Sequence, residues 1–114
     1  MNPDTLDLYV TRGGTLALEV ELVDEDDVPV PFPQGWSGKA QVRPGAGDPT
    51  LLLDLTVVLQ DPGVIVISAT DEATAAIPAE PNRGRWDCFL FDDAGNSWPI
   101  LAGEAFVRGR VTVP

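Results

Sequence analysis

Histidine is absent from this 114-residue sequence and cysteine occurs once, so the chain has few of the side chains on which enzymes and metal sites most often depend. Without histidine, a Ser-His-Asp or Cys-His mechanism is excluded, and so are the usual zinc and haem ligands. Cys88 has no partner for a disulfide within the chain and cannot form a cysteine zinc site alone. We therefore expect no catalytic residues, no cofactor and no metal, in a protein that is not an enzyme.

Basic residues are scarce too, because 7 lysines and arginines stand against 18 acidic residues and give a net charge of -11 at pH 7. This charge repels nucleic-acid phosphates and anionic membrane surfaces unless a strongly basic patch is present, and the arginines are too dispersed for one. Long apolar runs are missing, and the first residues lack the basic start and apolar core of a signal peptide. The sequence predicts no nucleic-acid or membrane partner, and a protein made and kept in the cytoplasm.

What the sequence does contain favours one β-rich domain. Apolar residues make up 44% of the chain, which is enough for a single core, and we expect one domain over residues 1–114. The 11 glycines and 11 prolines suit short strands and turns rather than a helical bundle. Alternating segments recur about every ten residues and predict about seven strands in an all-β, immunoglobulin-like antiparallel β-sandwich, with a small barrel as the alternative.

The stretch from residue 84 to 113 is the main basis for this fold prediction, because it predicts two strands joined by a turn. Trp86, Cys88 and Leu90 alternate with polar or aromatic residues, as in a strand with one buried face, and we interpret Cys88 as an inert core thiol. Residues 92–96 predict a turn, because Gly95 can take a positive φ and the aspartate and asparagine side chains can hydrogen-bond to their own backbone. Alternation then resumes and predicts a long last strand, which over residues 104–113 offers an edge for pairing with another chain.

Upstream, alternation predicts strands over residues 6–10, 16–22, 39–43, 51–57 and 64–67, the last two paired as a hairpin. Residues 28–33 contain three prolines, so we expect an extended connection that crosses between sheets. Thr70 is placed to cap a helix of one or two turns over residues 71–77, because acidic residues come first there and alanines follow.

Two acidic turns are the candidate metal sites. Residues 24–27 are four consecutive carboxylates, and Asp92, Asp93 and Asn96 lie together in the second turn. Calcium prefers several oxygen ligands, but neither turn has the full spacing of a calcium-binding loop, and solvated turns account for both. Paired carboxylates for glycoside hydrolysis need a cleft that sequence cannot show. We predict no metal at either turn.

Two phenylalanines indicate a contact surface. Phe89 and Phe91 lie opposite the predicted buried face of their strand, where a simple sandwich meets water. Either the proline-rich segment or the short helix covers them, or another protein does. Arginines of the last strands are expected to pair with acidic residues of a neighbouring strand or subunit. The predicted protein interface comprises Phe89, Phe91, Phe106, Arg108 and Arg110.

Several short motifs follow one another in a recognisable order. Residues 67–78 predict a strand followed by a short helix, Gly84-Arg85-Trp86 begins a strand, residues 92–95 read Asp-x-x-Gly, and Leu101-Ala102-Gly103 is a hinge before the closing strand. Residues 12–15, 24–27 and 39–43 extend the pattern over most of the chain. In this order the motifs resemble the immunoglobulin-like β-sandwich domains of tailed-bacteriophage virion proteins, among them baseplate, collar and minor tail components.

This resemblance implies a non-enzymatic structural protein of the virion, which is not secreted. It implies a tail-associated, collar or minor tail subunit, with a capsid decoration or head-tail neck protein as the alternative. The implied partners are other virion proteins, with this chain as a homo-oligomer or ring. A carbohydrate-binding module that aids host adhesion is a second class of function. The three tryptophans distinguish this second class from a structural protein. A sugar platform needs exposed, coplanar aromatic rings, whereas we expect Trp86 in the core; the other two are Trp36 and Trp98.

Overall fold

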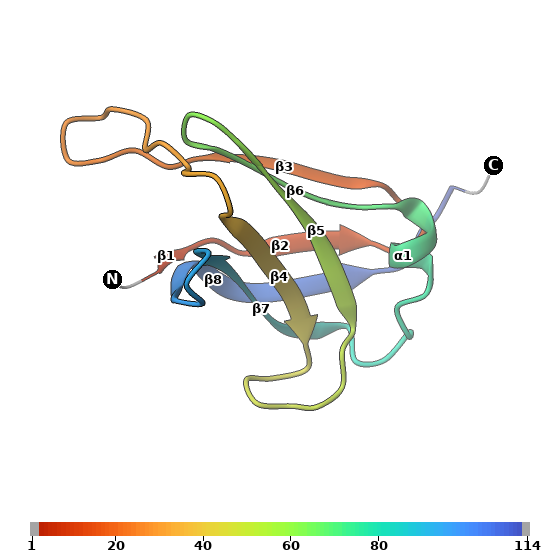
Figure 1. Ribbon diagram of the computed structural model, residues 1–114. Helices are drawn as coiled ribbons and strands as arrows, with labels where there is room; N and C mark the ends of the chain where they lie inside the picture. Colours follow the sequence, from red (N-terminus) through yellow and green to blue (C-terminus); the bar gives the residue numbers. More distant parts are fainter. Residues whose placement is uncertain (1–2, 113–114) are drawn as a thin grey trace.

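The computed structural model describes residues 3–112, which form eight strands and one short helix (Figure 1). In chain order these are β1 (Asp4–Thr5), β2 (Leu8–Thr11), β3 (Leu16–Glu21), β4 (Ser37–Arg43), β5 (Leu53–Gln60), β6 (Val64–Ala69), α1 (Asp71–Ala75), β7 (Arg83–Phe91) and β8 (Ser97–Arg108). They build a β-sandwich, which confirms the predicted fold class. Over the described residues, no helix has the length and apolar character needed to cross a membrane.

The strands form two sheets that share β5. Sheet A contains β1, β2, β8, β7, β4 and the start of β5, and sheet B contains the rest of β5, β6 and β3. The predicted hairpin is confirmed, because residues 56–60 of β5 pair with β6. Residues 28–33 lie between β3 of sheet B and β4 of sheet A, so the proline-rich segment crosses between sheets as predicted.

The core lies between the sheets and takes one face of each strand. On β7, Trp86 is 3% exposed, and Cys88 and Leu90 are buried beside it, which confirms the predicted inward face. Burial raises the pKa of Cys88 to about 12, and the negative charge of Asp87 adds to the rise. At neutral pH the thiol is therefore protonated, so it is a poor nucleophile and fills space in the core.

The last strand, β8, is paired along both edges. It runs antiparallel to β7 on one side and parallel to β1 and β2 on the other. The indole nitrogen of Trp86 donates a hydrogen bond of 2.7 Å to the Leu6 carbonyl, which lies between β1 and β2. Gly103 of β8 lies under the same carbonyl, where a Cβ atom would be 2.1 Å from the oxygen. The predicted free edge is therefore wrong, and the predicted hinge at residues 101–103 is an uninterrupted part of β8.

The predicted last strand is also too long, because β8 ends at Arg108. Its partner β2 stops at Thr11, which pairs with Arg108, and β7 begins at Arg83 opposite Phe106. Beyond Arg108 neither neighbour offers backbone groups for a ladder, although the alternation of side chains continues in the sequence. The predicted end of the strand at Val113 lies outside the described residues.

Side chains close the turn and cap the helix as predicted. In the turn between β7 and β8, Asp92 Oδ1 accepts hydrogen bonds from the backbone of Ala94 and Asn96, and Gly95 takes a φ of 87°. The Asn96 side chain donates to Asp92 Oδ2 at 3.0 Å. This side-chain bond, followed by the backbone bonds, lowers the pKa of Asp92. At the start of α1, Thr70 accepts a hydrogen bond from the Ala73 backbone.

Replacing Trp86 tests the core assignment. We expect Trp86→Ala to lower the free energy of unfolding by about 3–5 kcal/mol, because it leaves a cavity and orphans the Leu6 carbonyl. Trp86→Phe keeps most of the volume and should cost clearly less. Denaturant unfolding measures both, with Tyr9→Ala as a control, since Tyr9 is 68% exposed. Equal stability of Trp86→Ala and the parent would contradict the assignment.

The Asp92 turn makes a pH-dependent contribution to stability. Because the folded state lowers the pKa of Asp92, its ionised form stabilises the fold above the unfolded pKa of about 3.9, and this contribution is lost as the pH falls through the folded pKa. Asp92→Ala should therefore be less stable than the parent at pH 7, with a difference that shrinks in acid. Urea unfolding at several pH values measures this, with Asp93→Ala as the control from the same turn. A difference that is independent of pH would refute the role of the ionised carboxylate.

Candidate interaction surface

Aromatic and basic side chains meet on the outer face of sheet A. We use this name for the side chains of β2, β4, β7 and β8 that point away from the core. Registers and burial patterns assign them, because inward and outward positions alternate along a strand. The alternation is interrupted once, at a β-bulge in β8 where Ile100 and Leu101 are both buried. They include Tyr9, Thr11, Lys39, Gln41, Arg43, Arg83, Arg85, Asp87, Phe89, Phe91, Ala102, Glu104, Phe106 and Arg108.

Two aromatic pairs occupy opposite ends of this face. Tyr9 of β2 stacks on Phe106 of β8, with ring centroids 5.2 Å apart, and the Arg83 guanidinium lies 5.0 Å from the Phe106 ring centre. At the other end, Phe89 and Phe91 of β7 stack at 6.4 Å. Aromatic and arginine side chains of this kind are enriched in protein interfaces.

Phe89 and Phe91 are half-buried, so other residues of the chain cover part of both rings. They border a shallow hollow together with Lys39, Gln41 and Asp87 of their own sheet. The short helix does not cover them, because α1 contacts β5 and its Thr74 bonds to Gly13 and Gly14 at the turn between β2 and β3. Mutual stacking and their neighbours on the sheet reduce the exposure of both rings.

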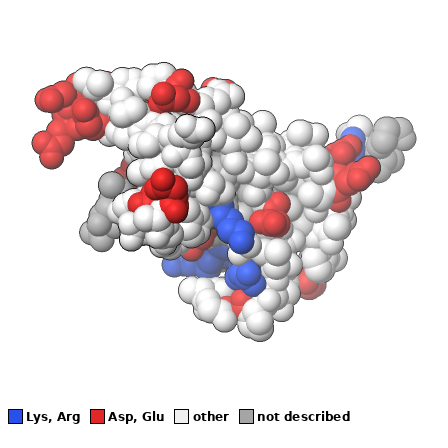
Figure 2. Space-filling model, viewed as in Figure 1, with Lys and Arg blue, Asp and Glu red and all other residues white. Residues whose placement is uncertain are grey.

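The outer face of sheet A carries most of the positive charge of the protein. Five of the 7 basic residues lie on it, with four acidic residues on or directly beside its strands, which leaves two basic and 14 acidic residues elsewhere. The basic five are Lys39, Arg43, Arg83, Arg85 and Arg108, and the acidic four are Asp7, Asp54, Asp87 and Glu104. Figure 2 shows basic side chains gathered near the middle of the view, with acidic ones beside them, and a group of acidic side chains alone at the loop tip on the left.

Glu104 forms ion pairs with two of the arginines, which agrees with the expected pairing of these arginines with acidic residues of a neighbouring strand. Arg83 Nη2 lies 2.8 Å from Glu104 Oε2, and Arg85 Nη1 lies 3.8 Å from Glu104 Oε1. The arginine side chains remain 64% and 61% exposed, so these ion pairs contribute little to folding. They order the guanidinium groups while leaving them accessible to a partner.

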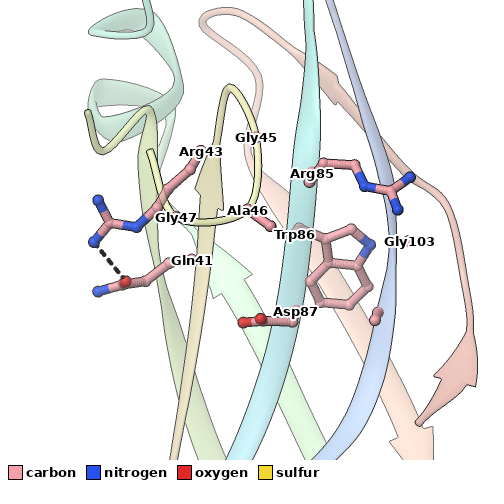
Figure 3. Close-up of a pocket in the computed structure, with 10 residues that line it drawn as sticks. Gln41, Arg43, Gly45, Ala46, Gly47, Arg85, Trp86, Asp87 and Gly103 are labelled. Atoms are coloured by element: carbon pink, nitrogen blue, oxygen red, sulfur yellow. Dashed lines mark hydrogen bonds between the residues drawn. The ribbon is translucent and has the colours of Figure 1, made fainter. Parts of the chain in front are cut away.

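A depression of about 350 Å³ lies in the centre of this face, where Ala102 and Gly103 have no large side chains (Figure 3). Arg43 donates 3.0 Å hydrogen bonds to the Gln41 side chain and to the Pro49 carbonyl. Its guanidinium group therefore stabilises the loop that follows β4. Figure 3 shows Arg85 extending to the opposite side of β7 from Arg43 and Gln41. The two guanidinium groups diverge and do not converge on one anion.

Among residues 3–112, Asp87 is the one carboxylate that lines this depression. Its side chain is exposed by surface area, but neighbouring atoms remove enough water to raise its pKa, and the charge of Arg43 opposes that rise. A single carboxylate beside occupied guanidinium groups can hydrogen-bond to a protein partner. For residues 3–112, no group of three or more histidine, cysteine or acidic side chains could hold a metal ion.

The structure gathers four of the five predicted interface residues. Phe89, Phe91, Phe106 and Arg108 all lie on the outer face of sheet A, where Arg108 donates to the Thr11 hydroxyl. Arg110 does not belong to the group, because it follows the end of β8 and its Nη1 donates to the Gly13 carbonyl at 2.9 Å. Tyr9 was missed, although its place between the buried Leu8 and Val10 already indicated an outward side chain.

The sandwich architecture agrees with a known protein family. Residues 2–112 match the family described as LtfC-like, beta-sandwich domain, and the chain belongs to that family. No curated protein matches the sequence.

Solved structures share the fold at low identity. The chain is similar to a crystal structure of the SrpA adhesin R347E mutant from Streptococcus sanguinis, with a TM-score of 0.50, 16% identity, and coverage of 90% of this chain and 55% of that one. It thus spans little more than half of that structure. Weaker similarities are to a VGSC beta subunit (TM-score 0.44, 14% identity, 93% and 92% coverage) and to the extracellular domain of the voltage-gated sodium channel beta4 subunit (0.39, 12%, 96% and 88%).

Calcium should leave the stability of the protein unchanged. In the turn at residues 24–27, Asp24 Oδ1 already accepts hydrogen bonds from the backbone of Asp26 and Val28, at 2.8 and 3.0 Å. We expect thermal melts with millimolar calcium and with a chelator to coincide, because a ligand shifts melting only if it binds the folded state. A calcium-dependent rise of many degrees would contradict the assignment of the acidic residues to solvated turns.

Proposed function

We propose that this chain is a non-enzymatic structural subunit of a tailed-bacteriophage virion, which acts by assembling with copies of itself and with other virion proteins. A tail-associated, collar or minor tail position is our first choice. The observation that carries the assembly proposal is the outer face of sheet A, an aromatic and nearly charge-balanced surface on a strongly acidic protein. The order of sequence motifs supports the virion setting, and membership of a β-sandwich domain family is compatible with it.

Electrostatics favour this face over the rest of the surface for contact between copies. Two molecules that each carry a charge of -11 repel one another over roughly the Debye length, about 8 Å at physiological salt. Contact through the outer face of sheet A brings together the regions with the least net negative charge. Burial of Tyr9 and the three phenylalanines then supplies the attraction.

The alternatives differ in position or in ligand. A capsid decoration or neck protein could use the same face, and only its place in the particle would distinguish it. A carbohydrate-binding module is less favoured, because Trp36 and Trp98 stack on one another at 5.1 Å and are half-buried, and Trp86 is in the core. Paired in this way, the rings do not lie side by side as a platform for a sugar.

Mass spectrometry of purified particles tests the virion assignment. In particles of the phage whose genome encodes this chain, we expect the protein at a fixed copy number relative to the major capsid protein. Immunogold labelling then separates tail, neck and capsid positions. Presence in the infected-cell lysate, combined with absence from purified particles, would contradict the proposed function.

A double substitution tests the contact face. Phe89→Ser with Phe91→Ser should weaken self-association about tenfold or more, because it removes one aromatic pair from the interface. Sedimentation velocity over a concentration series measures this, and added salt should strengthen association of the parent by screening its charge. Val58→Ser is the matched control, since Val58 is exposed on sheet B. A folded double variant that associates like the parent would exclude this end of the face.

A further inference from the structure

A second apolar surface lies at the end of the sandwich where β3 leads into the proline-rich segment. This groove of about 430 Å³ is lined chiefly by apolar side chains, among them Leu22, Val30, Trp36 and Trp98, together with the acidic residues Asp24 and Glu25. We call it the tryptophan groove. Its volume is within the range of about 300–1,000 Å³ that is usual for ligand sites in proteins.

The walls of the tryptophan groove are ordered before any ligand arrives. The rings of Trp36 and Trp98 stack at 5.1 Å with an angle of 11° between their planes, so each fixes the other. Asp24 is fixed by the two backbone hydrogen bonds to its carboxylate, and Glu25 is exposed beside it. The groove thus combines an apolar floor with negative charge, which fits an apolar side chain next to a basic one.

One segment of this chain offers that combination on its surface. Val111, in the segment of residues 109–112 that follows β8, is 97% exposed, and Arg110 precedes it. Each of the other six basic residues lacks a large exposed apolar neighbour in the sequence, because the residues beside them are small, polar, proline or buried. Charge complementarity therefore selects the 109–112 segment among the basic parts of the chain.

The segment and the groove lie at opposite ends of one molecule. Arg110 bonds to Gly13 in the turn that begins β3, whereas the groove starts at Leu22, just after β3 ends. Figure 1 shows β8 leading to the right end and the loop between β3 and β4 at the left, along a molecule 43 Å in its longest extent. A molecule therefore cannot fill its own groove.

We propose that the tryptophan groove binds the 109–112 segment of a second copy of this chain, with Val111 on the tryptophan floor and Arg110 beside Asp24 and Glu25. Such a contact joins two different surfaces, so repetition gives a ring if it closes and a filament if it does not. The inference builds on the proposed assembly function, because its partner is another copy. It uses none of the residues on the outer face of sheet A.

Mixing two variants tests this contact specifically. Val111→Asp replaces the apolar side chain of the segment and leaves the groove unchanged. Val23 and Glu25 both line the groove, so Glu25→Lys with Val23→Ser alters the groove and leaves the segment unchanged. Alone, each should lose about tenfold or more in end-to-end association. An equimolar mixture should form a 1:1 dimer that cannot grow, because one intact groove meets one intact segment. Sedimentation velocity and native mass spectrometry detect it, with circular dichroism to show that both variants fold.

A peptide provides an independent measurement. The peptide Arg-Gly-Arg-Val-Thr, which copies residues 108–112, should change the tryptophan emission of the parent, because Trp36 and Trp98 line the groove. The peptide Arg-Gly-Arg-Asp-Thr is the matched control and should bind about tenfold more weakly or worse. Absence of the mixed dimer and of any difference between the peptides would overturn the inference. Loss of association in the Phe89→Ser, Phe91→Ser variant bears only on the outer face, so the two proposals fail separately.

Discussion

The double pairing of β8 is the constraint on which the rest of this structure depends. The Trp86 indole holds the Leu6 carbonyl over Gly103, and this contact fastens β1 and β2 along the edge of β8 that β7 leaves open. Within the described residues, β1, β2 and β3 each have a ladder partner on one side only. On β3, the outward carboxylates of Glu19 and Glu21 oppose pairing of that strand with the same strand of another copy.

Strand register determines what the main face presents. β8, β7 and β4 lie side by side, so side chains that alternate along each strand fall into rows across the sheet. Phe106 meets Arg83, Glu104 meets Arg85, and Phe89 meets Lys39 in these rows. An acidic chain thus collects its few basic residues and most of its outward aromatic rings on one surface. The tryptophan groove lies apart from these rows, where the sheets separate, and combines an apolar floor with carboxylates.

Local pattern was enough to predict much of this architecture, and its limits are physical. Alternation identified the buried side of β7, turn chemistry identified Asp92 and Gly95, and capping chemistry identified Thr70, because each depends on residues close in sequence. The pairing of Tyr9 with Phe106, the stack of Trp36 on Trp98 and the second partner of β8 join residues far apart in sequence. Alternation also could not show that β8 ends at Arg108, since the end is determined by where β2 and β7 stop. The candidate interface could be predicted only in part. Alternation identified four of its outward residues on β7 and β8, but the neighbouring side chains on β2 and β4 depend on strand pairing, which the sequence does not show.

We propose that copies of this protein meet through the outer face of sheet A, and side-chain footprinting measures the contact itself. Hydroxyl-radical labelling of dilute and of concentrated protein compares the accessibility of the same side chains in free and associated molecules. We predict that labelling of Tyr9, Phe89, Phe91 and Phe106 falls together as association proceeds, while labelling of Val58, which is exposed on sheet B, stays constant. Protection of Val58 with unchanged labelling of the four aromatic residues would contradict the claim and assign the contact to sheet B.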